Sequence, residues 1–340
     1  MARMVNIAAA QMGPIAREET RAQVVERLIA HLREAARRGA ELVVFPELTL
    51  TTFFPRWWIE DAAELDAFYE TGMPGPTTQP LFDEAKRLGL GFCLGYAELV
   101  EQRGAKRRFN TAILVGPDGR VLGKYRKIHL PGHAEHEPWR RFQHLEKRYF
   151  EPGDLGFRVF EGFGGRIGLC ICNDRRWPET YRVMGLQGVE MVLLGYNTPV
   201  HNPPTPEHDA LSWHHNTLVM QSGAYQNATW VVGVAKGGTE EGVPSIAGSQ
   251  IIAPSGETVA QAVTEADELI TAACDLDLGR AYKEHVFNFA RHREPDHYRL
   301  ITELKGAVDP EEGARIEAAA RTRAEAAATI QIAAKLGAAE

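Results

Sequence analysis

The sequence has few cysteines, no long apolar run and no excess of positive charge. Its 4 cysteines among 340 residues lie in apolar segments, which favours reduced thiols over a disulfide framework. No apolar run reaches the roughly 18 residues of a membrane span, and the N-terminal run is too short for a signal peptide. The net charge of −7 argues against non-specific nucleic-acid binding. We therefore expect a cytoplasmic protein whose partners include neither a membrane nor nucleic acid.

Short apolar runs alternate along the chain with segments of helical periodicity, which is the pattern of an α/β fold. Residues 5–11 and 166–172 are predicted strands, and residues 20–38 are a predicted amphipathic helix. Turn signals at 117–119 and 255–256 predict two hairpins. Hairpins join antiparallel strands, so we expect mixed rather than purely parallel sheets.

The C-terminal tail differs in composition from the rest of the chain. No linker interrupts residues 1–305, which we expect to form one domain. Residues 306–340 are rich in alanine with interspersed Glu and Arg, and this composition favours a helix. The apolar face of that helix is thin, which suggests that the extension docks on a partner subunit.

The most informative stretch is GRIGLCICNDRRWPE, residues 165–179. A buried strand ends there at a sharp corner, and Pro178 suits the first turn of the following helix. Cys172 lies at the corner, where nearby positive charge can activate a thiol and backbone N–H groups can hold an oxyanion. Arg175 and Arg176 follow, so we expect an anionic substrate. The alternatives are a buried inert thiol and arginines that pair with a structural acid such as Asp174.

Two more predicted strands end at an ionisable residue. Glu47 follows the strand VVF, and Lys127 follows GKYR. Because functional groups of α/β proteins gather at strand ends, Glu47, Lys127 and Cys172 are candidates for a base, a cation and a nucleophile. The alternatives are a turn carboxylate for Glu47 and a solvated lysine for Lys127.

Three motifs resemble the nitrilase superfamily of carbon–nitrogen hydrolases. They are FPEL at 45–48, GKYRKIHLP at 123–131 and CICNDRRWPE at 170–179, in the order of that family. The resemblance implies a four-layer α-β-β-α sandwich, assembly into a homo-oligomer (a dimer or tetramer), and no cofactor or metal. It also implies that Glu47, Lys127 and Cys172 are the catalytic residues, with Glu146 as a second glutamate beside the lysine.

Further stretches are similar to one branch of the family, the N-carbamoyl-D-amino-acid amidohydrolases. Among them are FQHLEKRYFEPGDLGF at 142–157 and GYNTPVHNPP at 195–204. This similarity implies that Arg175 and Arg176 bind a substrate carboxylate, for which a guanidinium fork is well matched. It also implies that the backbone N–H of Asn173 holds the oxyanion.

Several other residues are candidates for the pocket. Asn197 and Thr198 follow the next predicted strand and could line it. His129 and His144 flank Lys127 and Glu146, and we expect them to form hydrogen bonds around the substrate pocket, behind the residues that touch the substrate. The alternative is that they are ordinary structural histidines. The histidine spacings match no common metal-ligand pattern, so we expect no metal site. The aromatic loop 53–58 could wall the pocket or fill the core and subunit contacts.

The resemblance implies hydrolysis of N-carbamoyl-D-amino acids to the D-amino acid, carbon dioxide and ammonia. The partner would be a small molecule that carries a carboxylate. One alternative is another amide or ureido hydrolase of the superfamily, such as a β-ureidopropionase or an aliphatic amidase. The other is a non-catalytic binding protein of the same fold.

Overall fold

The computed structural model describes residues 2–337, with side chains described up to residue 323. The backbone divides into two compact units, Met1–Phe287 and a second that begins at Asn288. The first unit contains two six-stranded mixed sheets among its described residues. The domain division at residue 305 stays a prediction, and residues 338–340 of the expected extension lie outside the described part.

The first sheet has the strand order β14-β1-β2-β3-β4-β5. Strands β1, β2 and β3 are parallel, whereas β14, β4 and β5 pair antiparallel with their neighbours. The hairpin expected around residues 117–119 is formed by β4 and β5. The strands are β1 (Met4–Gln11), β2 (Leu42–Val44), β3 (Gly91–Gln102), β4 (Ala105–Val115), β5 (Val121–Arg126) and β14 (Glu268–Asp275).

The second sheet has the order β13-β12-β9-β8-β7-β6 and the same mixed character. Strands β7, β8 and β9 are parallel, and β12 and β13 form the second expected hairpin. The strands are β6 (Val159–Gly162), β7 (Gly165–Ile171), β8 (Met191–Tyr196), β9 (Trp230–Ala235), β12 (Gln250–Ile252) and β13 (Thr258–Gln261). A separate small ribbon consists of β10 (Thr239–Glu240) and β11 (Val243–Pro244).

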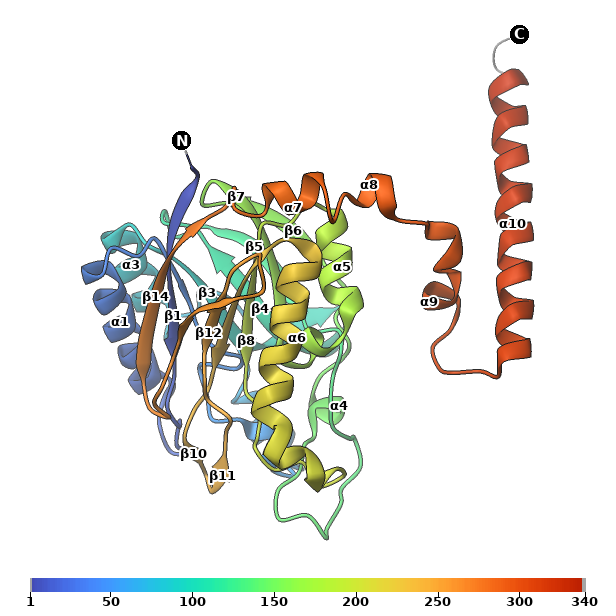
Figure 1. Ribbon diagram of the computed structural model, residues 1–340. Coiled ribbons are helices and arrows are strands. Elements are labelled where there is room, and N and C mark those ends of the chain that lie inside the picture. The colour runs from blue at the N-terminus through green and yellow to red at the C-terminus, as the bar shows by residue number, and fades with distance from the viewer. Residues whose placement is uncertain (1, 338–340) are drawn as a thin grey trace. The chain divides into compact units, whose positions relative to one another are not determined.

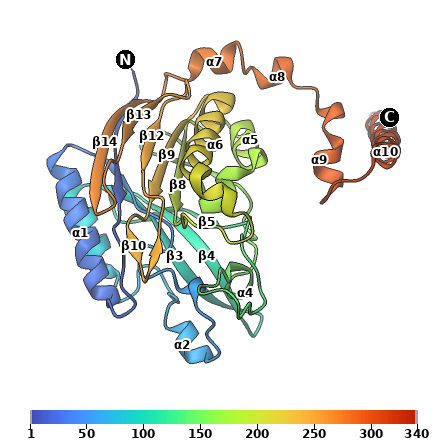
Figure 2. The same cartoon turned by 60° about the horizontal axis from the view of Figure 1, so that its bottom comes forward.

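Helices cover the outer face of each sheet, which confirms the expected four-layer sandwich (Figures 1 and 2). Helices α1 and α3 pack on the first sheet, and α5 and α6 pack on the second. Thr20 caps α1 together with Gln23, as their spacing predicts. The helices of the first unit are α1 (Arg21–Arg37), α2 (Ala62–Asp66), α3 (Gln79–Leu88), α4 (Glu146–Tyr149), α5 (Pro178–Leu186), α6 (Ser212–Asn227) and α7 (Arg280–Glu284), with 3-10 turns η1 (Phe54–Arg56), η2 (Cys172–Arg176) and η3 (Pro206–Leu211).

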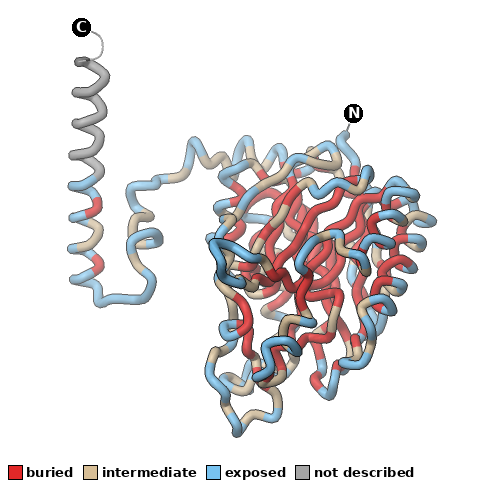
Figure 3. Tube along the Cα trace, turned by 180° about the vertical axis from the view of Figure 1, so that it is seen from behind, coloured by how far each residue is buried: buried red, intermediate tan, exposed pale blue. Residues whose placement is uncertain are grey.

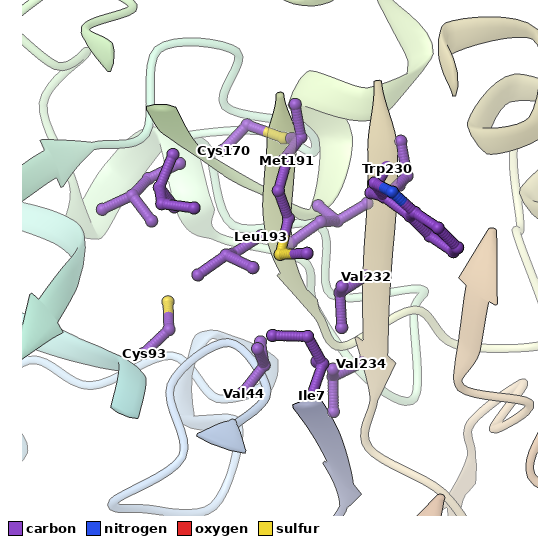
Figure 4. Packing of buried hydrophobic residues seen from close by; sticks show 14 of the residues in the cluster. Ile7, Val44, Cys93, Cys170, Met191, Leu193, Trp230, Val232 and Val234 are labelled. Atoms are coloured by element: carbon purple, nitrogen blue, oxygen red, sulfur yellow. The ribbon is translucent and has the colours of Figure 1, made fainter. Parts of the chain in front are cut away.

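The pleat of the strands divides the apolar residues between two cores. In β1, Ile7 and Ala9 belong to the cluster between the sheets, whereas Ala8 and Ala10 pack with the residues of α1 and α3. Figure 4 shows the cluster between the sheets, with Ile7 and Val44 from the first sheet facing residues of the second. Buried residues are concentrated in the strands (Figure 3). Burial on both faces explains why these strands are nearly continuous apolar runs in the sequence.

The second unit consists of helices joined by short turns. Within it, Arg299 donates a hydrogen bond to the carbonyl oxygen of Ala320, which links α9 to α10. Its elements are α8 (Phe289–His292), η4 (Pro295–His297), α9 (Arg299–Glu303) and α10 (Pro310–Gly337). The helical expectation for the tail is therefore confirmed over α10. In the described part of the chain, no helix is long and apolar enough to cross a membrane.

Two glycines hold the backbone of Glu47 between the sheets. A Cβ atom on Gly95 of β3 would lie 2.6 Å from the carbonyl oxygen of Pro46. A Cβ atom on Gly195 of β8 would lie 2.6 Å from the backbone nitrogen of Glu47. The strand end that carries Glu47 is thus packed against one glycine from each sheet.

We predict that Gly195→Ala lowers the free energy of unfolding by about 1–3 kcal/mol, because overpacking at this contact forces backbone shifts. Denaturant unfolding followed by fluorescence measures the change. Gly72→Ala is the matched control, since a Cβ atom there meets nothing within 4 Å. Equal stability of the two variants would contradict the proposed close approach.

Candidate active site

Cys172 lies at the corner between β7 and α5, as the sequence predicts. It is the first residue of η2 and has φ of 48°. This left-handed conformation is uncommon for a residue other than glycine, and such strain is concentrated at functional sites. This conformation therefore fixes the thiol at the end of β7. The backbone N–H groups of the remaining η2 residues follow directly after it.

Lys127 joins two glutamates in the interior. Its Nζ lies 2.6 Å from Oε1 of Glu47 and 2.6 Å from Oε2 of Glu146, and all three side chains are 0% exposed. Glu47 follows β2, Lys127 follows β5, and Glu146 opens α4. The structure thus brings together the three charged residues that the sequence placed at separate positions along the chain.

Two asparagines complete the surroundings of Glu47. Asn110 Nδ2 donates to Oε1 at 2.8 Å, and the backbone N–H of Asn197 donates to Oε2 at 2.9 Å. No motif in the sequence singles out Asn110. The register of the β4–β5 hairpin is what could have indicated Asn110. The backbone N–H of Lys127 donates a hydrogen bond to the carbonyl oxygen of Asn110, so the two residues lie side by side. These donors orient both carboxylate oxygens of Glu47.

The protonation states follow from burial and from the neighbouring charges. Burial raises the pKa of Glu47, although Lys127 opposes this shift. Burial opposes ionisation of Lys127, but the charges of Glu146 and Glu47 outweigh it and hold the pKa of Lys127 above the usual value. Lys127 and His144 outweigh burial at Glu146 and lower its pKa. Burial and the charge of Glu47 raise the pKa of Cys172, so the resting nucleophile is a thiol.

Cys172 opens onto a cavity of about 520 Å³. Its Sγ lies 3.8 Å from Thr198 Oγ1 and 3.9 Å from the carbonyl oxygen of Asn197. Asn173 and His144 also line this cavity, which we call the Cys172 cavity. The side chain of Asn197 is buried, and both of its amide atoms lack a hydrogen-bond partner among the described residues. An unpaired amide on the wall can donate to and accept from a bound molecule.

The two adjacent arginines have different surroundings. Arg176 is exposed on the wall of the Cys172 cavity and makes no hydrogen bond or ion pair with the described residues. Arg175 is 1% exposed, and it donates to Asn216 Oδ1, to the carbonyl oxygen of Cys172 and to Thr198 Oγ1. A contact between Arg175 and the substrate therefore stays a prediction. Arg175 supports the turn and Thr198 from behind, because its three nitrogens are already bonded to protein.

The two candidate histidines also separate. His144 lines the Cys172 cavity, and its Nε2 lies 3.2 Å from Oε1 of Glu146. His129 lies outside that wall, with Nδ1 2.9 Å from Asp174 Oδ1 and its ring stacked on Trp177. Its carbonyl accepts a hydrogen bond from Asn173 Nδ2 at 3.1 Å. His129 thus supports Asn173 from behind the wall, in keeping with the hydrogen-bonding role expected around the pocket, and a direct contact with substrate stays a prediction.

The aromatic loop mostly fills the core. Phe53 and Phe54 are buried in a third apolar cluster, which also contains Tyr69 and Tyr149.

Among residues 2–337, no group of three or more His, Cys, Asp or Glu side chains is arranged to hold a metal ion.

This arrangement suits nucleophilic attack on a carbonyl carbon. Glu47 can accept the thiol proton, and the thiolate can then attack. Lys127 and a backbone N–H group after Cys172 can stabilise the negative charge that develops on the oxygen. The buried ion pairs hold these groups in place before a substrate arrives.

We predict that iodoacetamide modifies Cys172 faster than the other three cysteines, which lie outside the Cys172 cavity. The pH midpoint of this alkylation should lie above the ordinary thiol value of 9.0. It should fall in Glu47→Gln, because removing a nearby negative charge favours the thiolate. Mass spectrometry of quenched samples measures both effects, and an unchanged or higher midpoint in Glu47→Gln would contradict the charge assignment.

Comparison with known proteins gives a consistent result. The model of the carbon-nitrogen hydrolase family matches residues 6–284. An N-carbamoylputrescine amidase from Solanum lycopersicum is 32% identical over 90% of this chain and 97% of its own length. A citrullinase from Francisella tularensis is 27% identical over 83% of this chain and 94% of its own length.

The fold is shared with solved structures of the same kind. A carbon-nitrogen hydrolase from Helicobacter pylori has a TM-score of 0.75 and 22% identity, covering 88% of this chain and 99% of that one. Family match, curated relatives and fold agree with the geometry around Cys172. The chain therefore belongs to the carbon–nitrogen hydrolases of the nitrilase superfamily and is an amidohydrolase of that family.

Proposed function

We propose that the protein hydrolyses N-carbamoyl-D-amino acids to the D-amino acid, carbon dioxide and ammonia. The observation that carries this proposal is the unpaired guanidinium of Arg176 on the wall of the Cys172 cavity. A carboxylate would supply the partner that Arg176 lacks, through a charge-assisted, bidentate contact. A small molecule with both a carbamoyl group and a carboxylate fits this wall.

The reaction proceeds in two halves. Glu47 accepts the proton of the Cys172 thiol, and the sulfur attacks the ureido carbon. Lys127 and the N–H of Asn173 hold the oxyanion, and Glu47 returns the proton to the departing nitrogen. A water molecule, deprotonated by Glu47, then cleaves the thioester, and the carbamic acid released decomposes to carbon dioxide and an amine or ammonia.

Further residues have supporting roles in this scheme. Glu146 holds Lys127 in position, and His144 is bonded to Glu146 on the cavity wall. Asn197 and Thr198 face the substrate, with the free amide of Asn197 available to the ureido group. No step needs a cofactor. We assign the D-configuration on the sequence stretches that are similar to the D-amino-acid branch.

The names of the relatives support carbamoyl chemistry. N-carbamoylputrescine and citrulline both carry a ureido group, and they name the substrates of two curated relatives. These relatives also favour a second candidate, namely hydrolysis of another ureido compound or of a simple amide. The requirement for a carboxylate separates the two candidates.

We also propose a homo-oligomer in the cytoplasm. Large apolar side chains are exposed on neighbouring helices, among them Val183 and Leu186 on α5 and Leu218 and Tyr225 on α6. Such a group of exposed apolar residues suits a subunit contact. A dimer or a tetramer would bury it.

We predict that Arg176→Ala raises KM for N-carbamoyl acids by about 10- to 100-fold, since a hydrogen bond to a charged group contributes about 1.5–3 kcal/mol. Steady-state kinetics should show little change for a neutral amide. Arg175→Ala is the contrasting variant, because it removes the donor to Asn216 Oδ1 and to Thr198 Oγ1 in the interior and should lower Tm. A similar KM with and without Arg176 would favour the second candidate.

We predict ammonia release from the D-forms but not the L-forms of N-carbamoylmethionine and N-carbamoylphenylglycine. Cys172→Ala serves as the blank, because it lacks the nucleophile. A coupled ammonia assay measures turnover. Turnover of neither form would overturn the proposed function, and simple amides and β-ureido acids would then be the next substrates.

A further inference from the structure

A second cavity of about 350 Å³ lies beside the Cys172 cavity. The two cavities share four wall residues, Arg140, His144, Pro199 and Asn202. The second cavity is further walled by the loop before α4 and by β11, which lie at the same end of the sandwich (Figure 1). A substrate held at Cys172 therefore has space for a side chain on the other side of His144.

The wall of the second cavity carries positive but no negative side chains. Arg56, Arg140 and Arg141 line it, and no Asp or Glu does. Arg140 is neutralised by an ion pair with Glu137. Arg141 is exposed, packs over the ring of Phe142 at 5.1 Å, and makes no hydrogen bond or ion pair with the described residues. One guanidinium on this wall is thus free for a ligand.

Arg56 contributes a buried positive charge that the one neighbouring buried carboxylate, Glu240, does not fully offset. Its side chain is 3% exposed and pairs with Glu240 at 2.9 Å, while Lys236 lies 3.2 Å from the other oxygen of Glu240. Two positive charges therefore share one buried carboxylate. Glu240 also accepts from the backbone N–H groups of Phe53 and Ile15, so its oxygens are fully used. Nη2 of Arg56 has no hydrogen-bond partner among the described residues.

An excess positive charge in a dry region is unfavourable unless an anion offsets it. The carboxylate of Glu241 also acts on Arg56, but it is exposed and bonded to the backbone N–H of Arg17. Solvent weakens that attraction. Arginine stays protonated even when burial lowers its pKa, as it does here, so the charge persists.

We propose that the second cavity binds the substrate side chain and prefers a side chain that ends in a carboxylate. This inference rests on the proposed function, which places an N-carbamoyl amino acid at Cys172. The distal carboxylate would face Arg141 and the charge of Arg56, and Phe53 and Phe142 would contact the methylene groups. A lysine-like side chain would meet like charges and be rejected.

The test compares two substrates of nearly equal shape, N-carbamoyl-D-glutamate and N-carbamoyl-D-glutamine. Both have the α-carboxylate, so the ratio of their kcat/KM values reports only on the distal group. We expect the wild type to prefer the glutamate form by about tenfold, which corresponds to about 1.4 kcal/mol. Arg141→Gln should reduce this ratio toward one, and Arg56→Met should reduce it as well.

Arg158→Gln is the matched control, because Arg158 is also exposed and packs over a phenylalanine ring, that of Phe160, outside both cavities. It should leave the ratio unchanged. Equal use of the two substrates by the wild type, or a ratio that survives both Arg141→Gln and Arg56→Met, would overturn the inference. If Arg56→Met fails to fold, the ratio in Arg141→Gln decides alone.

The binding readout separates this inference from the proposed function. Calorimetric titration of Cys172→Ala with N-carbamoyl-D-glutamate needs no turnover. We expect Cys172→Ala to bind the glutamate form more tightly than the glutamine form, and Cys172→Ala/Arg141→Gln to lose this difference. That result would support the carboxylate-binding second cavity even if the wild type hydrolysed neither compound. Turnover of N-carbamoyl-D-methionine without any preference for the glutamate form would overturn the subsite and leave the proposed function intact.

Discussion

The ammonium of Lys127 between two buried carboxylates is the interaction on which the site depends. Its Nζ contacts Glu47 and Glu146 at 2.6 Å in a region that solvent does not reach. Without this cation, two carboxylates would face each other in the interior, at a cost of several kcal/mol. Because the three charges stabilise one another, Glu47 can keep a raised pKa and still be held in one orientation. The nucleophile, the base and the oxyanion site are therefore arranged before substrate binds.

These charges come from both sheets of the sandwich. Glu47 and Lys127 follow strands of the first sheet, whereas Cys172 and Asn197 follow strands of the second. The packing between the sheets thus sets the distance between base and nucleophile. Two connecting segments without a long helix, residues 127–145 and 197–205, form most of the walls of the two cavities.

The sequence predicts the fold class and the strand ends because both depend on local patterns. Burial on two faces produces the apolar runs, and Cys172 is recognisable at its corner because Pro178 marks the start of the next helix. The different roles of Arg175 and Arg176 are not predictable in this way. They depend on Asn216 of α6 and on the ring of Tyr196, which lies 4.5 Å from the Arg175 guanidinium and is distant in sequence. Likewise, Arg56 and Glu240 are joined only by the tertiary fold.

The glycine contacts at Glu47 have a consequence for protein engineering. Gly95 and Gly195 allow two backbones to approach Glu47 so closely that main-chain contacts fix its backbone, while Lys127 and Asn110 orient its carboxylate. The second cavity is lined by other segments, around residues 139–144 and 199–203. Mutant libraries restricted to these segments, with His144 kept because it bonds to Glu146, would change the wall of the second cavity and leave Glu47, Lys127 and Cys172 untouched. Libraries that include either glycine would mix losses of folding with changes of specificity.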